Sequence, residues 1–261
     1  MSDFTLEPLY DYPQREQVLA LARTNAEAVD RGERSPFETL REIAKDGLIT
    51  LGRDGGSLVP QVAVAFDLAT EDATTAFSLW AHRSTIAFFD AVGRELPEGL
   101  ANATVSGTTA MAAAYKEASG LEPIKVKGTL VEGGLKLNGS ISWASNLYPS
   151  GVIVLPVALE NAPEGHPDRY IVTIRQDVPG LEIYYHRDLL ALNSTESGTL
   201  KFEDVFVPSE DILSDNLEAF LHDVTAPFLL VQSSWAWPQV LCRRPLSTWT
   251  CRRASSAPSS R

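Results

Sequence analysis

The chain has 261 residues, of which 44% are hydrophobic and 21% are charged, and its formal net charge is −12 at pH 7. This composition is ordinary for a water-soluble protein, and the length allows one large or two small domains. The acidic balance argues against nucleic acid as a general partner, because phosphate groups would be repelled. No apolar run reaches about 18 residues, so we expect no membrane span and no membrane partner.

The two cysteines, Cys242 and Cys251, lie near the C-terminal end, so the body of the chain has no disulfide framework. The first residues, MSDFTLEPLYDYPQ, lack the basic and apolar regions of a signal peptide. These features predict a protein of the reducing cytoplasm.

Residues 1–104 are predicted to form an all-α domain, because apolar residues recur there at helical spacing. After a first helix beginning near Pro13, Ser35 is expected to cap a second one. Pro36 suits the first turn, Glu38 would complete a capping box with Ser35, and Gly47 supplies a stop.

Three further helices are expected before residue 104. The third runs from about Val59 to Leu68, and a short fifth follows Pro97. The fourth, TTAFSLWAHRSTIAFFDAV, is apolar on nearly all sides and should be buried. His82 lies in this fourth helix, where a satisfied, partly buried histidine is the expected role.

Residues 105–213 change to a pattern of short strands with turn signals between them. Gly133-Gly134 is the expected hairpin turn, and the unit should be mostly antiparallel. Residues 214–232 are predicted to be helical again, with APFLLVQ at the end. The expected fold class is therefore α+β.

The final segment, residues 233–261, differs from everything before it. It contains no Asp, Glu or Lys, but five arginines, three tryptophans and both cysteines. A basic arm that binds nucleic acid or membrane and a disordered tail are two interpretations. We favour a third, in which this irregular tail is out-of-frame translation after a frameshift near Ser233; the encoding DNA read in another frame after Gln232 should then give an amphipathic helix.

Common catalytic motifs are absent from the sequence. There is no GxGxxG after a strand, no GxxxxGK[ST] and no GxSxG. The four histidines are scattered without metal-ligand spacing, so no metal site is predicted. Hydrolase and metalloenzyme functions are therefore disfavoured.

Several stretches together resemble the acyl-CoA dehydrogenase superfamily, whose members are FAD-dependent flavoproteins. They are GLITLGRDGG, LWAHRST, KVKGTLVEGGLKLNGSISWASN, IVTIRQDVPGLEI and STESGTLKFEDVFVPSEDIL. The resemblance covers about Val18 to Gln232. It implies a helical N-terminal domain, a β-barrel-like middle domain and a C-terminal four-helix domain, of which residues 214–232 would be a truncated start and the rest would be missing.

The resemblance also implies which residues would contact FAD. Trp143 would form a wall for the flat flavin ring, and Ser145 would donate to the ring edge. Because Trp143 and Ser145 are two residues apart on a predicted strand, both should face the same side. The pattern alone leaves open that Trp143 is only a core tryptophan.

The segment before this strand departs from the family. Where the family has Leu-Thr-Glu-Pro-x-x-Gly-Ser-Asp, a gapless count places AMAAAYKEASG. Met111, Ala112 and Ala113 would then be strand residues that contact the flavin through their backbone, with Ala113 replacing the family's Thr. Ser119 keeps the Ser near the substrate. These changes argue against acyl-CoA as the substrate.

The predicted function is α,β-dehydrogenation of an acyl-CoA thioester, or of a related small-molecule substrate, with hydride transfer to FAD. No catalytic residue can be named, because the family's glutamate base belongs to the C-terminal domain. We therefore expect impaired turnover, and the loss of a partner for Phe228, Leu229 and Leu230 should lower solubility. Family members are homo-oligomers, but their interface domain is not seen here. A flavin-dependent monooxygenase and a non-enzymatic binding scaffold remain alternatives.

Overall fold

The computed structural model describes residues 11–53 and 56–233, with the side chains of α6 described as far as Thr225. The helices are α1 (Arg15–Asp30), α2 (Pro36–Ala44), α3 (Val59–Glu71), α4 (Ala73–Ala91), α5 (Ala112–Ala118) and α6 (Leu217–Ser233). The strands are β1 (Gly107–Thr109), β2 (Lys127–Val131), β3 (Gly134–Ala144), β4 (Val152–Leu159), β5 (Arg169–Arg175), β6 (Leu181–Tyr185), β7 (Gly198–Pro208) and β8 (Ile212–Ser214). Short 3-10 turns, η1 (Asn193–Thr195) and η2 (Ser209–Asp211), flank β7.

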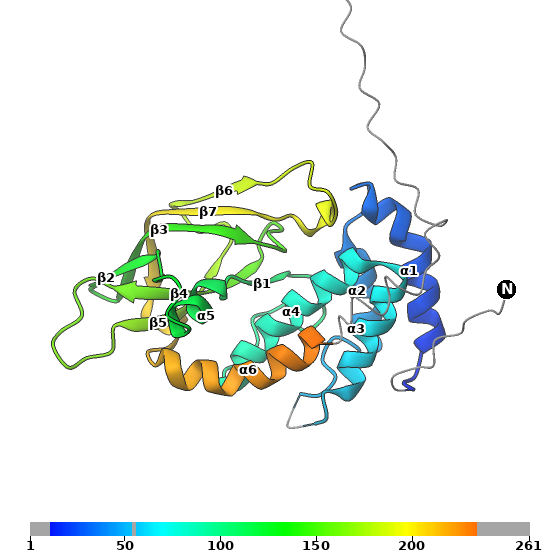
Figure 1. Ribbon diagram of the computed structural model, residues 1–261, viewed down its shortest axis with the longest axis horizontal. Helices are drawn as coiled ribbons and strands as arrows, with labels where there is room; N and C mark the ends of the chain where they lie inside the picture. The colour runs from blue at the N-terminus through cyan, green and yellow to red at the C-terminus, as the bar shows by residue number, and fades with distance from the viewer. Residues whose placement is uncertain (1–10, 54–55, 234–261) are drawn as a thin grey trace, which may run out of the picture.

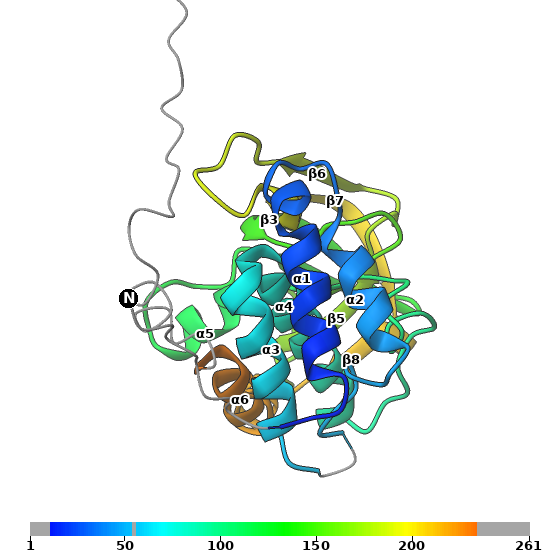
Figure 2. The same ribbon diagram turned by 90° about the vertical axis from the view of Figure 1, so that its right-hand side faces the viewer.

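The helices before residue 104 form one end of the molecule, and the sheet forms the other (Figure 1). Helices α1, α2 and α3 lie next to one another on the side away from the sheet (Figure 2). The predicted order of helices, strands and a final helix is thus confirmed. The predicted solubility defect at Phe228, Leu229 and Leu230, and the predicted frameshift tail, lie outside the described side chains and residues.

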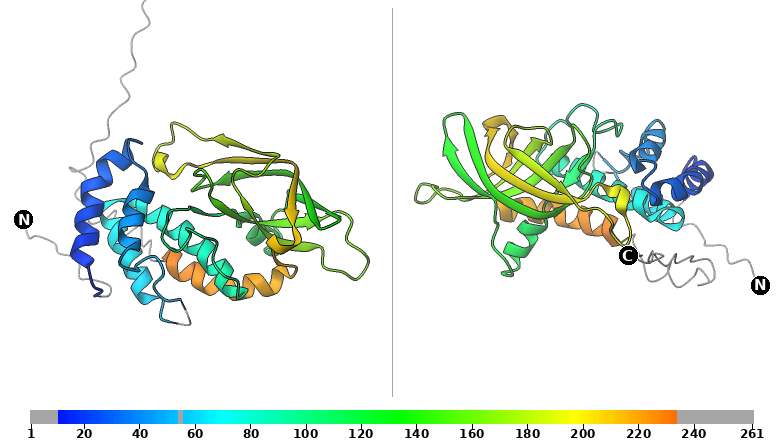
Figure 3. Two further views of the ribbon diagram at one scale, coloured as in Figure 1. Left: turned by 180° about the vertical axis from the view of Figure 1, so that it is seen from behind. Right: turned by 90° about the horizontal axis from the view of Figure 1, so that it is seen from above.

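Helix α4 runs through the centre of the structure, as its apolar sequence predicted. Asp72 caps its start by accepting hydrogen bonds from the backbone N–H groups of Thr74 and Thr75 at 3.0 and 3.1 Å. Phe88 of α4 is fully buried, and its ring centroid lies 5.7 Å from that of Phe220 in α6. Helix α6 therefore packs along α4 beneath the sheet (Figure 3, left).

Two details of the helical end differ from the prediction. Ser35 caps α2, but its hydroxyl accepts from Phe37 N–H at 3.2 Å, and Glu38 pairs with Arg34 instead of closing a capping box. The segment after Pro97 forms turns instead of a fifth helix. Gly99 has a φ of +85°, a left-handed conformation that a right-handed helix cannot continue through.

The strands form one eight-stranded sheet whose main order is β6-β7-β3-β2-β4-β5-β8, with β1 paired to β4. The pairs β1–β4 and β2–β4 are parallel, and the other pairs are antiparallel. The sheet is strongly curved, as the view from above shows (Figure 3, right), but it is not closed. The middle unit is thus an open, curved sheet that resembles part of a barrel.

The β2–β3 hairpin has its turn close to the predicted place. Val131 pairs with Gly134, so the turn residues are Glu132 and Gly133, and Gly134 already belongs to β3. A Cβ atom at Gly134 would lie 2.0 Å from the carbonyl oxygen of Val207 in β7. The second glycine is therefore required by the close approach of β7.

Asn146, just beyond β3, joins the helical end to the sheet. Its side-chain amide donates to the carbonyl oxygens of Ser78 in α4 and Gly107 in β1, at 2.9 and 3.1 Å. Its backbone N–H donates to the carbonyl oxygen of Thr195 at 2.7 Å. Asn146 has a φ of +66°, a conformation that asparagine tolerates better than most residues. These contacts fix the end of β3 relative to α4.

His82 is buried and satisfied, as the sequence predicted, and its burial is complete. Its Nδ1 accepts from Gly107 N–H at 2.9 Å, and its Nε2 lies 2.8 Å from the Leu100 carbonyl oxygen, to which it donates. Burial lowers the pKa of His82 to about 4. Among the helices within the described residues, none is long and apolar enough to cross a membrane.

Candidate functional site

The indole of Trp143 lies at the end of β3 and is 53% exposed, which excludes the alternative of a core tryptophan. The imidazole of His186, the residue after β6, stacks on it with ring centroids 4.5 Å apart and planes inclined by 25°. His186 Nε2 lies 3.3 Å from the carbonyl oxygen of Ser142. That oxygen also accepts a hydrogen bond from the Thr199 hydroxyl at 2.9 Å. The indole thus stays half open to solvent with the imidazole stacked on it.

A pocket of about 110 Å³ lies beside Trp143, between α5 and β3. Small and apolar side chains make up much of its lining: Ala112, Ala113, Ile124, Ile141, Trp143 and Pro156. Ligand pockets for drug-sized molecules have volumes of roughly 300 Å³ or more. At about 110 Å³, this pocket is smaller than a cavity that would enclose a ligand of that size.

The carboxylate that lines this pocket is Glu122, which pairs with Lys116 at 2.9 Å and also with Lys125. Hydrogen bonds from Lys125 and Lys116 lower the pKa of Glu122 to about 2. A general base works best when its pKa is near the working pH. Glu122 is therefore not a candidate for the base that removes a substrate proton.

The structure places the predicted residues Met111, Ala112 and Ala113 at the start of α5 instead of on a strand. Met111 is buried, whereas Ala112 and Ala113 line the pocket. An alanine-rich run favours helix, which explains why the gapless count failed here. The backbone N–H groups of a first helical turn have no partner within the helix, so those of Ala112 and Ala113 can serve a ligand.

The strand that precedes this pocket is β1, which contains Thr108 and Thr109 and pairs in parallel with β4. The Thr108 hydroxyl donates to the Asn146 carbonyl oxygen at 2.9 Å, and Thr109 is half-buried. Neither threonine was predicted from the sequence to lie near the site. The two adjacent β-branched residues ahead of the alanine run were the signal that could have found the strand.

Ser145 follows β3 and is not part of that strand. The strand ends at Ala144, and its pairing with β7 shifts register between Ile141 and Ala144. Strand alternation therefore does not extend to Ser145. Ser145 is buried, and its hydroxyl lies 2.7 Å from the Ser197 hydroxyl.

Ser119, the predicted substrate contact, is exposed at the C-terminal end of α5. It follows Glu117 and Ala118, which line a second and larger pocket of about 700 Å³. Ser119 is not among the residues that line this pocket.

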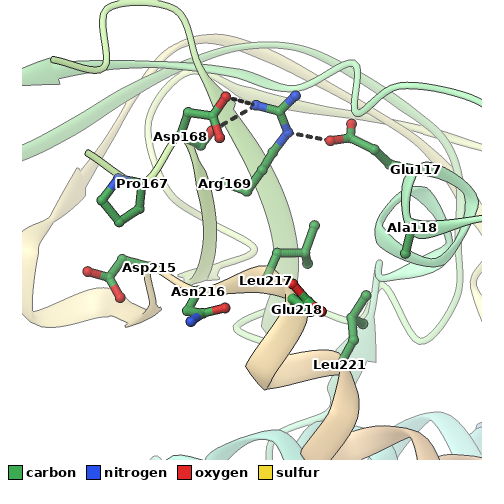
Figure 4. Close-up of a pocket in the computed structure, with 10 residues that line it drawn as sticks. All are labelled: Glu117, Ala118, Pro167, Asp168, Arg169, Asp215, Asn216, Leu217, Glu218 and Leu221. Atoms are coloured by element: carbon green, nitrogen blue, oxygen red, sulfur yellow. Dashed lines mark hydrogen bonds and ion pairs between the residues drawn. The ribbon is translucent and has the colours of Figure 1, made fainter. Parts of the chain in front are cut away.

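The second pocket lies between α5, β5 and the start of α6 (Figure 4). Four carboxylates and one guanidinium line it: Glu117, Asp168, Asp215, Glu218 and Arg169. The Arg169 side chain pairs with Glu117 and with Asp168, the latter at 2.7 Å.

Burial opposes ionisation of Glu117, but hydrogen bonds from Arg169 and from the Ile124 backbone N–H outweigh it and lower the pKa of this carboxyl. The lining of the second pocket is therefore net acidic at neutral pH.

No model of a known protein family matches the sequence. Isovaleryl-CoA dehydrogenase, mitochondrial, from Oryza sativa subsp. japonica is 28% identical over 92 residues, which are 35% of this chain and 22% of the rice protein. Butyryl-CoA dehydrogenase from Megasphaera elsdenii has a similar structure, with a TM-score of 0.63 and 20% identity over 89% of this chain and 65% of that chain. A glutaryl-CoA dehydrogenase from Mycobacterium smegmatis, solved in complex with FADH2, gives a TM-score of 0.61 and 16% identity over 87% of this chain and 63% of that chain.

The chain thus spans less than two thirds of the length of these relatives. The helices that precede the sheet, the curved sheet and the helix that follows it agree with the structural matches and with the motifs in the sequence. The described chain has the fold shared by acyl-CoA dehydrogenases and related flavoproteins.

Proposed function

We propose that this chain is an acyl-CoA dehydrogenase-like flavoprotein that binds FAD against Trp143. The observation that carries the proposal is the half-exposed indole beside a pocket whose lining is in part small and apolar. A flavin ring is flat and apolar on its faces, so it fits an aromatic and aliphatic wall.

Particular groups of this chain would hold the flavin. Trp143 would pack against its ring system, and the backbone of Ala112 and Ala113 would donate hydrogen bonds. Met111 would act only through its backbone, because its side chain is buried. Ser145 would have to exchange its bond with the Ser197 hydroxyl for one with the ring edge. Ser119, at the end of α5, would contact the substrate.

When bound, FAD would supply the hydride acceptor for α,β-dehydrogenation of an acyl-CoA thioester. The chain's own residues would bind and orient both molecules and keep water from the ring. We propose that turnover is impaired in this chain, since two lysines lower the pKa of Glu122, the carboxylate at the Trp143 pocket, so far that it is a weak base.

Flavin uptake tests the proposal directly. Purified protein incubated with FAD and then desalted should be yellow, with flavin-like visible absorbance. Trp143→Ala should weaken FAD binding about tenfold or more, because the aromatic wall is lost. Phe206→Ala is the matched control, since Phe206 is another exposed aromatic residue, on β7 and 43% exposed. Wild-type protein that takes up no FAD would contradict the proposal and favour a non-enzymatic scaffold.

A flavin-dependent monooxygenase acting on an uncharged or cationic substrate is the second candidate. The acidic lining of the larger pocket favours it, because coenzyme A carries several negative phosphate charges that Glu117, Asp168, Asp215 and Glu218 would repel.

Calorimetric titration with coenzyme A distinguishes the two activities. Measurable binding of coenzyme A by the wild type, with higher affinity in Asp215→Asn, would support the dehydrogenase. The Asp215 carboxylate would then repel the coenzyme A phosphates without preventing binding. No binding of coenzyme A, together with substrate-dependent oxygen uptake in the presence of a flavin reductase, would support the monooxygenase.

A further inference from the structure

We propose that His186 is a positioning residue for the flavin. Its imidazole covers one face of the Trp143 indole and leaves the opposite face for the ring system of FAD. This inference rests on the proposed function, because it assigns a residue to the same pocket.

The backbone fixes His186 where β6 ends. Its N–H donates to the carbonyl oxygen of Ser197 at 2.8 Å and so continues the pairing of β6 with β7. In the sheet order β6-β7-β3, strand β7 separates His186 from Trp143. The side chain therefore reaches across β7 to meet the indole.

The imidazole is held at its edge as well as on its face. Its Nε2 lies 3.3 Å from the Ser142 carbonyl oxygen and 3.4 Å from the Thr199 hydroxyl. Ser142 directly precedes Trp143. The contact of His186 Nε2 with the Ser142 carbonyl oxygen therefore holds the imidazole next to the backbone that carries the indole. The flat face of the imidazole then lies on the indole, with the two planes inclined by 25°.

This arrangement makes the indole a ready-made surface. A tryptophan that is 53% exposed would otherwise lose side-chain freedom when a ligand packs on it. The stacked imidazole removes that freedom before the ligand arrives, so the binding site is preorganised. It also closes one face of the indole, so the flavin can stack from one side only.

Three variants test this role, each titrated with FAD by the quenching of flavin fluorescence. His186→Ala should weaken binding about three- to tenfold, the range expected for the loss of an aromatic pair. The bound flavin should also be less quenched, because a mobile indole stacks on it for less of the time. His186→Phe keeps the stack and should restore both the affinity and the quenching. His166→Ala, an exposed histidine in the loop between β4 and β5, should match wild type.

The urea midpoints of all variants are measured in parallel. If His186→Ala binds and quenches FAD like wild type, the positioning role is wrong while the flavin site stands. The role is also wrong if the loss of FAD affinity in His186→Ala is accompanied by a lower urea midpoint and His186→Phe fails to restore quenching. The weaker binding would then come from partial unfolding. If wild-type protein binds no FAD, the proposed function itself is wrong, and the role of His186 is withdrawn with it.

Discussion

At the scale of single residues, Asn146 connects the candidate site to the rest of the molecule. Its side-chain amide donates to two buried carbonyl oxygens, those of Ser78 and Gly107. Buried acceptors that lose their donor keep their desolvation penalty, so such bonds matter more than exposed ones. Trp143 lies three residues before Asn146, so these hydrogen bonds fix the backbone close to Trp143.

Asn146→Ala should lower the free energy of unfolding by about 2–4 kcal/mol, from the lost hydrogen bonds and from the left-handed backbone that alanine resists. Asn146→Gly also lacks the amide but adopts the left-handed backbone without strain. Its free energy of unfolding should therefore be about 1 kcal/mol higher than that of Asn146→Ala. Urea denaturation of the two variants measures both contributions. Equal stability of Asn146→Ala and wild type would show that the amide does not hold the junction.

His82 should make stability depend on pH. Its pKa is lowered from 6.5 to about 4 in the folded protein, so the unfolded chain takes up a proton at a higher pH than the folded one. The contribution of neutral His82 to the free energy of unfolding is fully present above about pH 6.5. It is lost as the pH falls towards 4, by about 1.4 kcal/mol per pH unit. Urea midpoints across this range measure the slope. His82→Gln, which does not titrate, should show a shallower slope; an unchanged slope would assign the effect to other groups.

The sequence predicted Trp143 as a site residue but not its surroundings. The structure shows its side chain open beside a pocket, whereas Ser145 lies beyond the end of β3 and turns inward. Strand parity holds only while a strand keeps its register, and β3 shifts register before Ala144. His186 could not be found from the sequence, because its contact depends on which strands become neighbours.

At the scale of elements, the β2–β3 hairpin shows how tightly β7 packs on β3. Gly134 faces the Val207 carbonyl oxygen across this contact. A methyl group at residue 134 would push β3 and β7 apart at one end of their ladder. Trp143 lies near the other end of the same ladder.

Gly134→Ala should therefore destabilise the protein by about 2 kcal/mol or more, as overpacking against backbone does. Gly133→Asn is the matched control, because Gly133 has a φ of +80° but no atom within 4 Å of an added Cβ. Asparagine accepts such a conformation with little strain. Thermal unfolding of both variants gives the comparison, and an equal loss in the two would mean that turn conformation dominates over the close approach.

Helix α5 is the element that the sequence placed wrongly. The gapless count assigned strand positions to residues that favour a helix. Alanine has the highest helix propensity, and the structure puts the run Ala112–Ala118 in a helix directly after the short strand β1. Local helix propensity was therefore the better guide to residues 112–118 than the gapless count.

At the scale of the whole molecule, the change from helical to strand periodicity near residue 105 predicted the order of the two parts. The domain limits 1–104, 105–213 and 214–232 remain predictions. The strand order, with β2 and β1 both beside β4, was not predictable, because pairing between distant segments leaves no local trace in the sequence. The open form of the sheet likewise depends on such pairings.

Binding of FAD should stabilise the whole folded unit. A ligand present at about 100 times its dissociation constant raises the free energy of unfolding by about 2.7 kcal/mol if it binds only the folded state. Thermal unfolding with and without FAD should show this shift in wild type and in Phe206→Ala, and about half of it in Trp143→Ala if that variant binds about tenfold more weakly. An unchanged midpoint in wild type at saturating FAD would mean that the folded chain does not bind it.

Helix α5 borders both pockets: Ala112, Ala113 and Lys116 line the smaller one, and Glu117 and Ala118 line the larger one. Neighbouring residues of an α-helix point about 100° apart around its axis. The adjacent residues Lys116 and Glu117 therefore serve different pockets from two sides of one short helix. Inserting one residue between them would rotate one lining against the other.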